Sequence, residues 1–204
     1  MKEENEVLVS ELREVTTVTT IKDQSASAGP LGLSAFGICT IMLSLVNAGV
    51  IPLDAMVLSM GLFYGGVTQI IVGLLEGKKG NTFGLVAFTS YGIFWVSFVS
   101  INVIPSLGWL AQASSGAMIT YLIMWCLFTV ILFIGTLRIG KLLQVLFGAL
   151  ILLFVLLIIG SIAGSSAILT LAGYEGLLVG AISLYAASAF LLNELFGKSI
   201  LPVG

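Results

Sequence analysis

The sequence contains no histidine, and only 9% of its residues are charged. Without imidazole there is no histidine zinc site, no Ser-His-Asp triad and no histidine proton relay. No other group of residues is typical of a catalytic centre, so we expect no enzymatic activity, no metal and no cofactor. Lys and Arg number 8 against 10 Asp and Glu, which excludes the basic surface that nucleic acid binding requires.

The scarcity of charge also excludes an ordinary soluble domain. Such domains contain about 25% charged residues, whereas this chain of 204 residues is 58% hydrophobic. The two cysteines, Cys39 and Cys126, lie in apolar stretches and are interpreted as small buried side chains. The composition therefore predicts an integral membrane protein.

Long uncharged runs lie between the charged residues, at 24–53, 55–75, 80–137, 142–174 and 176–193. A membrane-spanning helix needs about 20 apolar residues, so the run 80–137 holds two spans, separated at Pro105 and Gly108. None of the runs has the sustained alternation of a β-barrel strand. The sequence predicts an all-α integral membrane protein, a bundle of six transmembrane helices at 31–50, 54–75, 82–104, 115–137, 141–163 and 171–195.

All the Lys and Arg residues fall on one side of these helices. They lie in the N-terminal segment, between the second and third helices, between the fourth and fifth, and after the sixth. By the positive-inside rule, both termini are cytoplasmic and the protein is a multi-pass protein of the cell membrane. Residues 1–26 lack the pattern of a signal peptide and are expected to form a cytoplasmic tail, followed by a transmembrane domain at 27–204.

Pairs of glycines four residues apart recur in the spans. Such pairs place small residues on one helix face, so that neighbouring backbones can approach closely. They predict a tightly packed bundle and occur at Gly61 and Gly65, Gly160 and Gly164, and Gly176 and Gly180.

Polar residues within the spans follow a regular spacing. Phe36, Tyr91 and Leu150 each precede a polar residue by eleven positions, about three helical turns. This repetition predicts three similar helix pairs around a pseudo-threefold axis. Two interpretations of the polar residues remain open, interhelical hydrogen bonding or a water-accessible path for a solute; the residues are Thr40, Ser44, Asn47, Gln69, Asn102 and Ser161.

Ordered motifs extend over the chain after the tail. They are PLGL at 30–33, GLFYGG at 61–66 followed by Gln69, LEGKKGNTFGL at 75–85, AFTSYG at 87–92, GTL at 135–137, and Asn193-Glu194, Gly197 and Leu201-Pro202. In this order they resemble the succinate-acetate permease family, also called acetate uptake transporters. The chain departs from the family at 27–29, where Ser-Ala-Gly stands in place of Asn-Pro-x.

The resemblance implies a channel-like protomer, a homo-hexamer in membrane lipid, and a separate path through each protomer. It implies acetate as the substrate, with succinate and other small monocarboxylates as further candidates. It also implies a narrow apolar constriction in the acetate permease domain, which falls on Phe36, Tyr91 and Leu150.

The expected path holds no fixed ionic charge, so helix N-termini and amide and hydroxyl donors have to attract the acetate anion. We expect the constriction to accept a methyl-sized tail and to disfavour longer or doubly charged acids. Channel-like flow and proton-coupled transport both remain open, with Glu194 as the candidate proton carrier. The alternatives are a non-transporting membrane scaffold or sensor, and a channel for a small neutral solute or ammonium.

Overall fold

The computed structural model describes residues 2–6 and 26–204, and no strand occurs among them. Most of the predicted tail, residues 1 and 7–25, lies outside the described residues, while 2–6 form a short helix. Six helical segments are long and apolar enough to cross a membrane, which confirms the predicted all-α six-helix fold. They are Gly29–Asn47, Ala55–Lys78, Thr82–Ser106, Ser115–Thr136, Lys141–Ala163 and Ser166–Phe196.

Short polar side chains begin four of the helical spans, because a side-chain oxygen can accept from the free N–H groups of a first turn. Asp54 caps the second span, and the other caps are Asn81, Ser114 and Ser165. The first span, α2 (Gly29–Asn47), has Pro30 in its first turn instead.

Two predicted features of the helix ends are wrong. The last span, α8 (Ser166–Phe196), begins earlier than residue 171, because Gly164 ends α7 (Lys141–Ala163) in the left-handed conformation and Ser165 caps a new helix at once. Pro105 does not interrupt the third span, α5 (Thr82–Ser106), but lies in its last turn. The chain turns instead at Gly108, where φ is +74°.

The second span is not a regular α-helix. It consists of α3 (Ala55–Met60), a π-helical segment η1 (Gly61–Thr68) and α4 (Gln69–Lys78). The hydroxyl of Thr68 donates to the carbonyl of Phe63, five residues earlier, at 3.0 Å. A π-helical turn contains more residues than an α-helical one and is frequent at functional sites; here it ends directly before Gln69.

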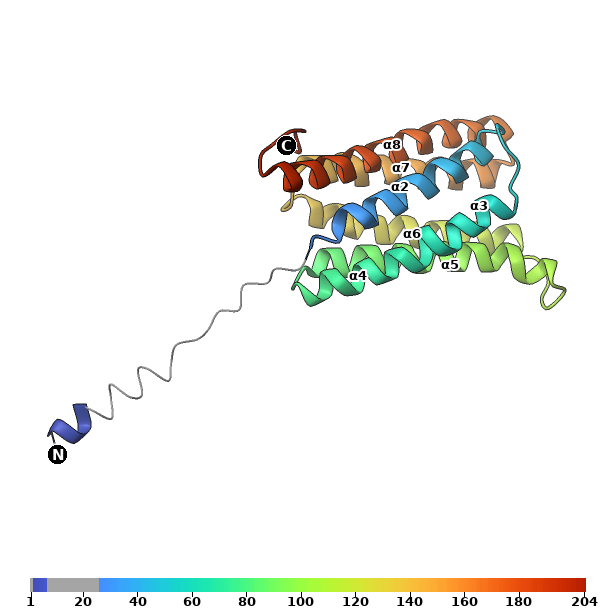
Figure 1. Ribbon diagram of the computed structural model, residues 1–204. Helices are drawn as coiled ribbons and strands as arrows, with labels where there is room; N and C mark the ends of the chain where they lie inside the picture. The colour runs from blue at the N-terminus through green and yellow to red at the C-terminus, as the bar shows by residue number, and fades with distance from the viewer. Residues whose placement is uncertain (1, 7–25) are drawn as a thin grey trace.

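The spans form a closed ring in which each packs against its neighbours in the chain (Figure 1). The ring runs from α2 through the second span to α5, then through α6 (Ser115–Thr136), α7 and α8, and α8 closes it by packing along α2. Figure 1 shows the C-terminus at the end of the bundle where α2 begins. The interior of this ring is where a path across the membrane can lie.

Glycines allow several of these contacts to be close, as their spacing predicts. A Cβ atom on Gly65 would lie 2.8 Å from Cγ of Trp95, and one on Gly176 would overlap Oγ of Ser44. Gly164 is different, since it has positive φ at the end of α7 and no atom within 4 Å of its Cβ position.

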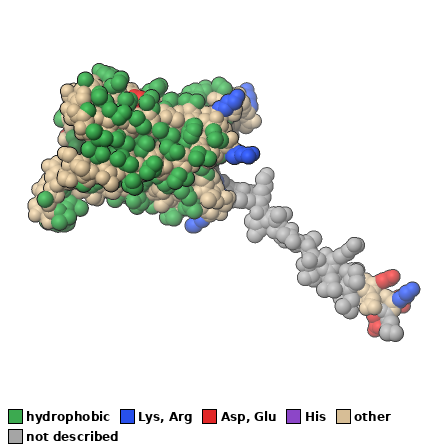
Figure 2. Space-filling view, turned by 180° about the vertical axis from the view of Figure 1, so that it is seen from behind, with side chains coloured by type: hydrophobic (Ala, Val, Ile, Leu, Met, Phe, Trp, Pro, Cys, Tyr) green, Lys and Arg blue, Asp and Glu red, His purple; other side chains and the backbone are tan. Residues whose placement is uncertain are grey.

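The cations of the bundle gather at one end (Figure 2), the end where α2 begins in Figure 1. We call this the basic end and the opposite one the far end. The positive-inside rule assigns the basic end to the cytoplasm. The cations are Lys78, Lys79, Arg138, Lys141 and Lys198, at the ends of α4, α6 and α8 and the start of α7.

Candidate functional site

A cavity of about 480 Å³ lies inside the ring towards the basic end, and we call it the inner cavity. The first turns of α2 and α5 and the first residues of α7 contribute to its wall. The N-terminus of a helix carries roughly half a positive charge, so these helix ends attract an anion. Most of the wall is apolar and includes Leu33, Phe83, Leu143, Leu146, Phe147 and Phe190.

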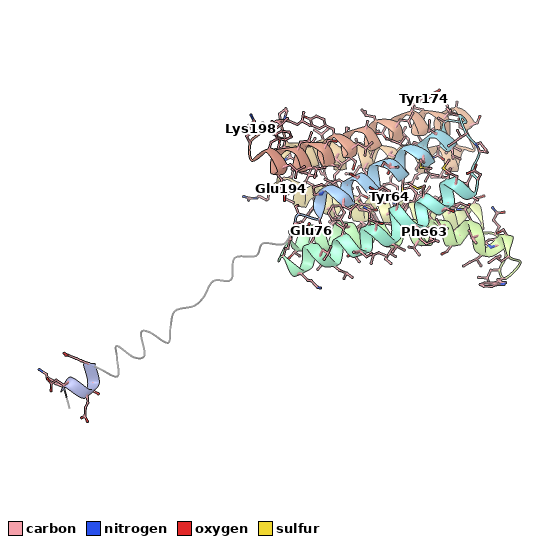
Figure 3. The ribbon with its side chains drawn as sticks, viewed as in Figure 1. Phe63, Tyr64, Glu76, Tyr174, Glu194 and Lys198 are labelled. Carbon is pink, nitrogen blue, oxygen red and sulfur yellow. The ribbon has the colours of Figure 1, made fainter. Side chains whose placement is uncertain are left out.

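Two carboxyl groups also line the inner cavity. Glu76, at the end of α4, is buried, and its Oε2 accepts a hydrogen bond from Nδ2 of Asn81 at 2.7 Å. Glu194 comes from the end of α8, and Figure 3 shows both residues at the same end of the bundle. The expectation of a path without fixed ionic groups is therefore wrong for this cavity. The sequence conceals the arrangement because the two residues come from spans far apart in the chain.

A second, smaller cavity of about 50 Å³ lies beyond the inner one, and we call it the outer cavity. The hydroxyls of Thr40 and Ser44 and the amide of Asn47 line it from α2. Trp95 lines it from α5, is only 2% exposed, and has no hydrogen-bond partner for its indole Nε1. The outer cavity thus presents several donors able to hold a carboxylate oxygen.

Phe36, Tyr91 and Leu150 line both cavities and so form the partition between them. They come from α2, α5 and α7, and all three are buried. The ring centroids of Phe36 and Tyr91 are 5.6 Å apart. The partition is apolar except for the Tyr91 hydroxyl, which lies 2.8 Å from Oγ1 of Thr129.

Gln69 lies on the wall of the inner cavity with 1% of its surface exposed. Its Nε2 donates to the carbonyl of Gly32 at 3.4 Å, which determines the orientation of the amide. Its Oε1 is buried and has no hydrogen-bond partner. The side chain therefore offers an unused acceptor beside the inner cavity.

The structure brings together most of the residues that the sequence singles out. Thr40, Ser44 and Asn47 line the outer cavity, and Gln69 the inner one. Asn102 and Ser161 line neither cavity, and Nδ2 of Asn102 donates to the carbonyl of Phe98 in its own helix. Their part in a path stays a prediction.

Some lining residues are absent from the sequence-based set. Trp95 follows Tyr91 by four residues, and Phe147 precedes Leu150 by three, so each lies on the same helix face as a residue of the partition. The ring centroids of Phe147 and Tyr91 are 6.2 Å apart. Both residues could have been predicted from the sequence by taking the positions three or four residues from Tyr91 and Leu150.

Comparison with known proteins shows the family of this chain. Residues 12–201 match the model of the GPR1/FUN34/yaaH family. The chain belongs to this family. Among its relatives, a succinate-acetate/proton symporter, SatP of Escherichia coli, is 50% identical over 88% of this chain and 95% of its own length. Acetate permease A of Emericella nidulans is 34% identical over 87% of this chain and 65% of its own.

A solved structure shows that the fold is shared as well. The bacterial acetate channel SatP superposes with a TM-score of 0.87 at 49% identity, covering 89% of this chain and all of that one. Together with the six apolar helices, these similarities establish a multi-pass membrane protein of a transporter and channel family, not an enzyme.

Proposed function

We propose that this protein carries acetate across the membrane through the inner cavity, the partition of Phe36, Tyr91 and Leu150, and the outer cavity. The observation that carries the proposal is that these three residues line both cavities, so that one short apolar barrier separates two cavities inside the ring of helices. The names of relatives, which include a symporter, a permease and a channel for acetate, support the same solute.

The partition suits a solute with a small apolar end. Aromatic rings and a leucine side chain can contact a methyl group, but they cannot replace the hydration of a charge. Helix N-termini at the inner cavity and donors in the outer cavity hold the carboxylate on either side. Weak binding at both sites favours passage, since a deep well would retain the solute.

Succinate is the second substrate that we propose, with slower passage than acetate. Its two carboxylates both lose hydration at the partition, whereas acetate loses the hydration of one. A relative named for both acids supports succinate as a substrate. Competition between unlabelled succinate and labelled acetate, measured at equal concentrations, shows which of the two acids the protein prefers.

We also propose that six copies assemble in the membrane, each with its own path. The path lies within a single ring of helices and needs no residue from a second copy. Outward-facing apolar side chains, such as those of Ile131 and Ile134 on α6, are available for lipid or a neighbouring copy. Native mass spectrometry from detergent reports the copy number; a monomer or dimer would contradict the hexamer without affecting the path.

Transport is tested by exchange of labelled acetate in proteoliposomes at equal pH on both sides. We expect the labelled acetate to exchange much faster than in protein-free vesicles, whose rate accounts for acetic acid that crosses lipid unaided. A labelled neutral solute of similar size and labelled methylammonium, in the same vesicles, test the alternative channels. Exchange of these two solutes without acetate would overturn the proposal, and no exchange of any solute would favour a scaffold or sensor.

A further inference from the structure

Trp95 supplies the outer cavity with a buried donor that lacks an acceptor. Its indole Nε1–H can only donate a hydrogen bond, and burial without a partner costs free energy that a ligand oxygen would recover. The hydroxyls of Thr40 and Ser44 line the same cavity, and neither forms a hydrogen bond with the part of the chain that the structure describes. Three donors around one small cavity are therefore free for an occupant.

The indole is oriented with its Nε1 edge away from the second span. A Cβ atom on Gly61 would approach Cε3 and Cζ3, and one on Gly65 would approach Cγ, so η1 packs against the face and one long edge of the ring. Nε1 lies on the opposite long edge of an indole. None of the described residues of η1 lines the outer cavity, whereas Trp95 does. The edge that carries Nε1 is thus the one that borders the cavity.

The three donors lie directly beyond the partition. α2 and α5 are the first and third spans, so they run in the same direction through the bundle. Thr40 follows Phe36 by four residues and Trp95 follows Tyr91 by four, about one helical turn in each case. Ser44 lies one turn further along α2. A solute in the outer cavity therefore meets the apolar partition on one side and the donors on the other.

The outer cavity has the size of a small acid. A water molecule needs about 10 to 15 Å³ of such a cavity, so its volume of about 50 Å³ takes roughly four groups of that size. Acetate, with two carbons and two oxygens, matches this number. Succinate has twice as many heavy atoms and exceeds it.

The lining of the outer cavity favours an anion over a cation. Among the described residues, no Asp or Glu lines it, whereas Glu76 and Glu194 line the inner cavity. Hydrogen bonds to an ionised acceptor are shorter and about twice as strong as those to a neutral one. An indole N–H has no lone pair to offer a cation. A carboxylate therefore gains more from these three donors than water or a cation does.

We propose that the outer cavity is a binding site for one small monocarboxylate. The carboxylate accepts hydrogen bonds from Nε1 of Trp95 and from the hydroxyls of Thr40 and Ser44, and its alkyl end lies against Phe36. This inference rests on the proposed function and deepens it, because it places a resting position directly beside the partition. Trp95 recognises the charged end of the solute, and the partition receives the alkyl end first.

The binding site is tested by NMR of purified protein with ¹⁵N-labelled tryptophan, in which the three Trp residues give separate indole N–H resonances. Trp95→Phe identifies one of them by its loss. We expect sodium acetate to move the Trp95 resonance downfield until it saturates, compared with sodium chloride at equal ionic strength. Trp109, which is exposed, is the internal control and keeps its position. An equal response of Trp95 to acetate and chloride would overturn the proposal and indicate a cavity that holds only water.

The size of the occupant is tested in the same titration. Succinate at the same concentration is expected to move the Trp95 resonance less than acetate does, because it exceeds the volume of the cavity. Equal shifts with both acids would overturn a site for one small monocarboxylate.

Two further variants test the hydroxyl donors. Thr40→Val and Ser44→Ala each remove one hydrogen bond to a charged group, so we expect the acetate concentration at half-maximal shift to rise about tenfold. The matched control is Ser100→Ala, because the Ser100 hydroxyl donates to the carbonyl of Val96 and does not line the outer cavity. Unchanged positions of the other two indole resonances show that each variant is folded. A wild-type midpoint in both Thr40→Val and Ser44→Ala would overturn the site.

Exchange of labelled acetate in proteoliposomes at equal pH separates this inference from the proposed function. Exchange by a protein whose Trp95 resonance does not respond to acetate would overturn the binding site and leave the path. A saturable response of Trp95 in a protein that exchanges no acetate would support the binding site and overturn the path.

Discussion

The hydrogen bond between Tyr91 and Thr129 has a determined direction. Oγ1 of Thr129 already donates its single hydrogen to the carbonyl of Trp125 at 2.7 Å, so Tyr91 has to be the donor in the 2.8 Å contact between the two side chains. Both residues are buried. This contact holds the ring of Tyr91 in the partition from behind, on the side of α6.

Removal of either partner has unequal consequences for stability. Tyr91→Phe removes the donor and leaves Thr129 with its bond to Trp125, so we expect a loss of about 1 kcal/mol in the free energy of unfolding. Thr129→Val leaves a buried hydroxyl without an acceptor, which costs about 1 to 3 kcal/mol. Thermal unfolding in detergent gives the order, and a larger loss in Tyr91→Phe would contradict this assignment of the donor.

Leu150 limits the size of the solute. Leu150→Ala shortens one wall of the partition, so we expect uptake of propionate and butyrate to rise relative to acetate. The control is Leu152→Ala, two residues further along α7 and 49% exposed on the outer surface. Uptake of each labelled acid in proteoliposomes gives the ratios, and an unchanged preference in Leu150→Ala would show that the partition does not select by size.

At the scale of single elements, the π-helical segment η1 and its glycines shape the wall of the path. Gly61 and Gly65 let the second span lie against Trp95, which lines the outer cavity. The same segment ends at Gln69, which lines the inner cavity. One irregular element thus contributes to both sides of the partition.

Gly65→Ala tests this contact. The added Cβ would lie 2.8 Å from Cγ of Trp95, whose indole is enclosed, so overpacking should lower stability by about 1 to 3 kcal/mol. Gly148→Ala is the matched control within a span, since its Cβ would make only an ordinary contact with Phe133 at 3.6 Å. Thermal unfolding compares the two variants. Equal melting temperatures would mean that η1 can shift to accommodate the added Cβ without loss of stability, which would contradict the close contact with Trp95.

At the scale of the whole molecule, the sequence predicts the features that depend only on the order of residues along the chain. Uncharged runs of sufficient length and the one-sided cations lead to six helices and their ends, apart from the start of α8 and the place of Pro105. The two cavities depend instead on how the helices pack. Spacing along the chain predicts neither the π-helical segment η1 nor the presence of Glu76 and Glu194 in the wall of one cavity.

The repeat of eleven residues shows which site residues periodicity can predict and which it cannot. It identifies Phe36, Tyr91 and Leu150, which meet at one level of the bundle. Asn102 and Ser161 lie about 16 Å further along their helices, at 1.5 Å per residue. On α5 and α7 the residues that line the outer cavity extend only to Trp95 and Leu157, whereas on α2 they extend to Asn47, the third member of the repeat. Equal spacing along the helices therefore does not give equal access to the cavity.

The most direct test of the account is to close the partition with one large side chain. Leu150→Trp fills the barrier between the cavities, and Leu152→Trp places the same side chain on the outer surface of α7. Size-exclusion profiles and thermal unfolding confirm that both variants are folded, and exchange of labelled acetate is then measured in proteoliposomes at equal pH. We expect exchange by Leu150→Trp to fall to the level of protein-free vesicles and exchange by Leu152→Trp to stay near the wild-type rate. Acetate exchange at the wild-type rate in a folded Leu150→Trp variant would contradict a path through this partition.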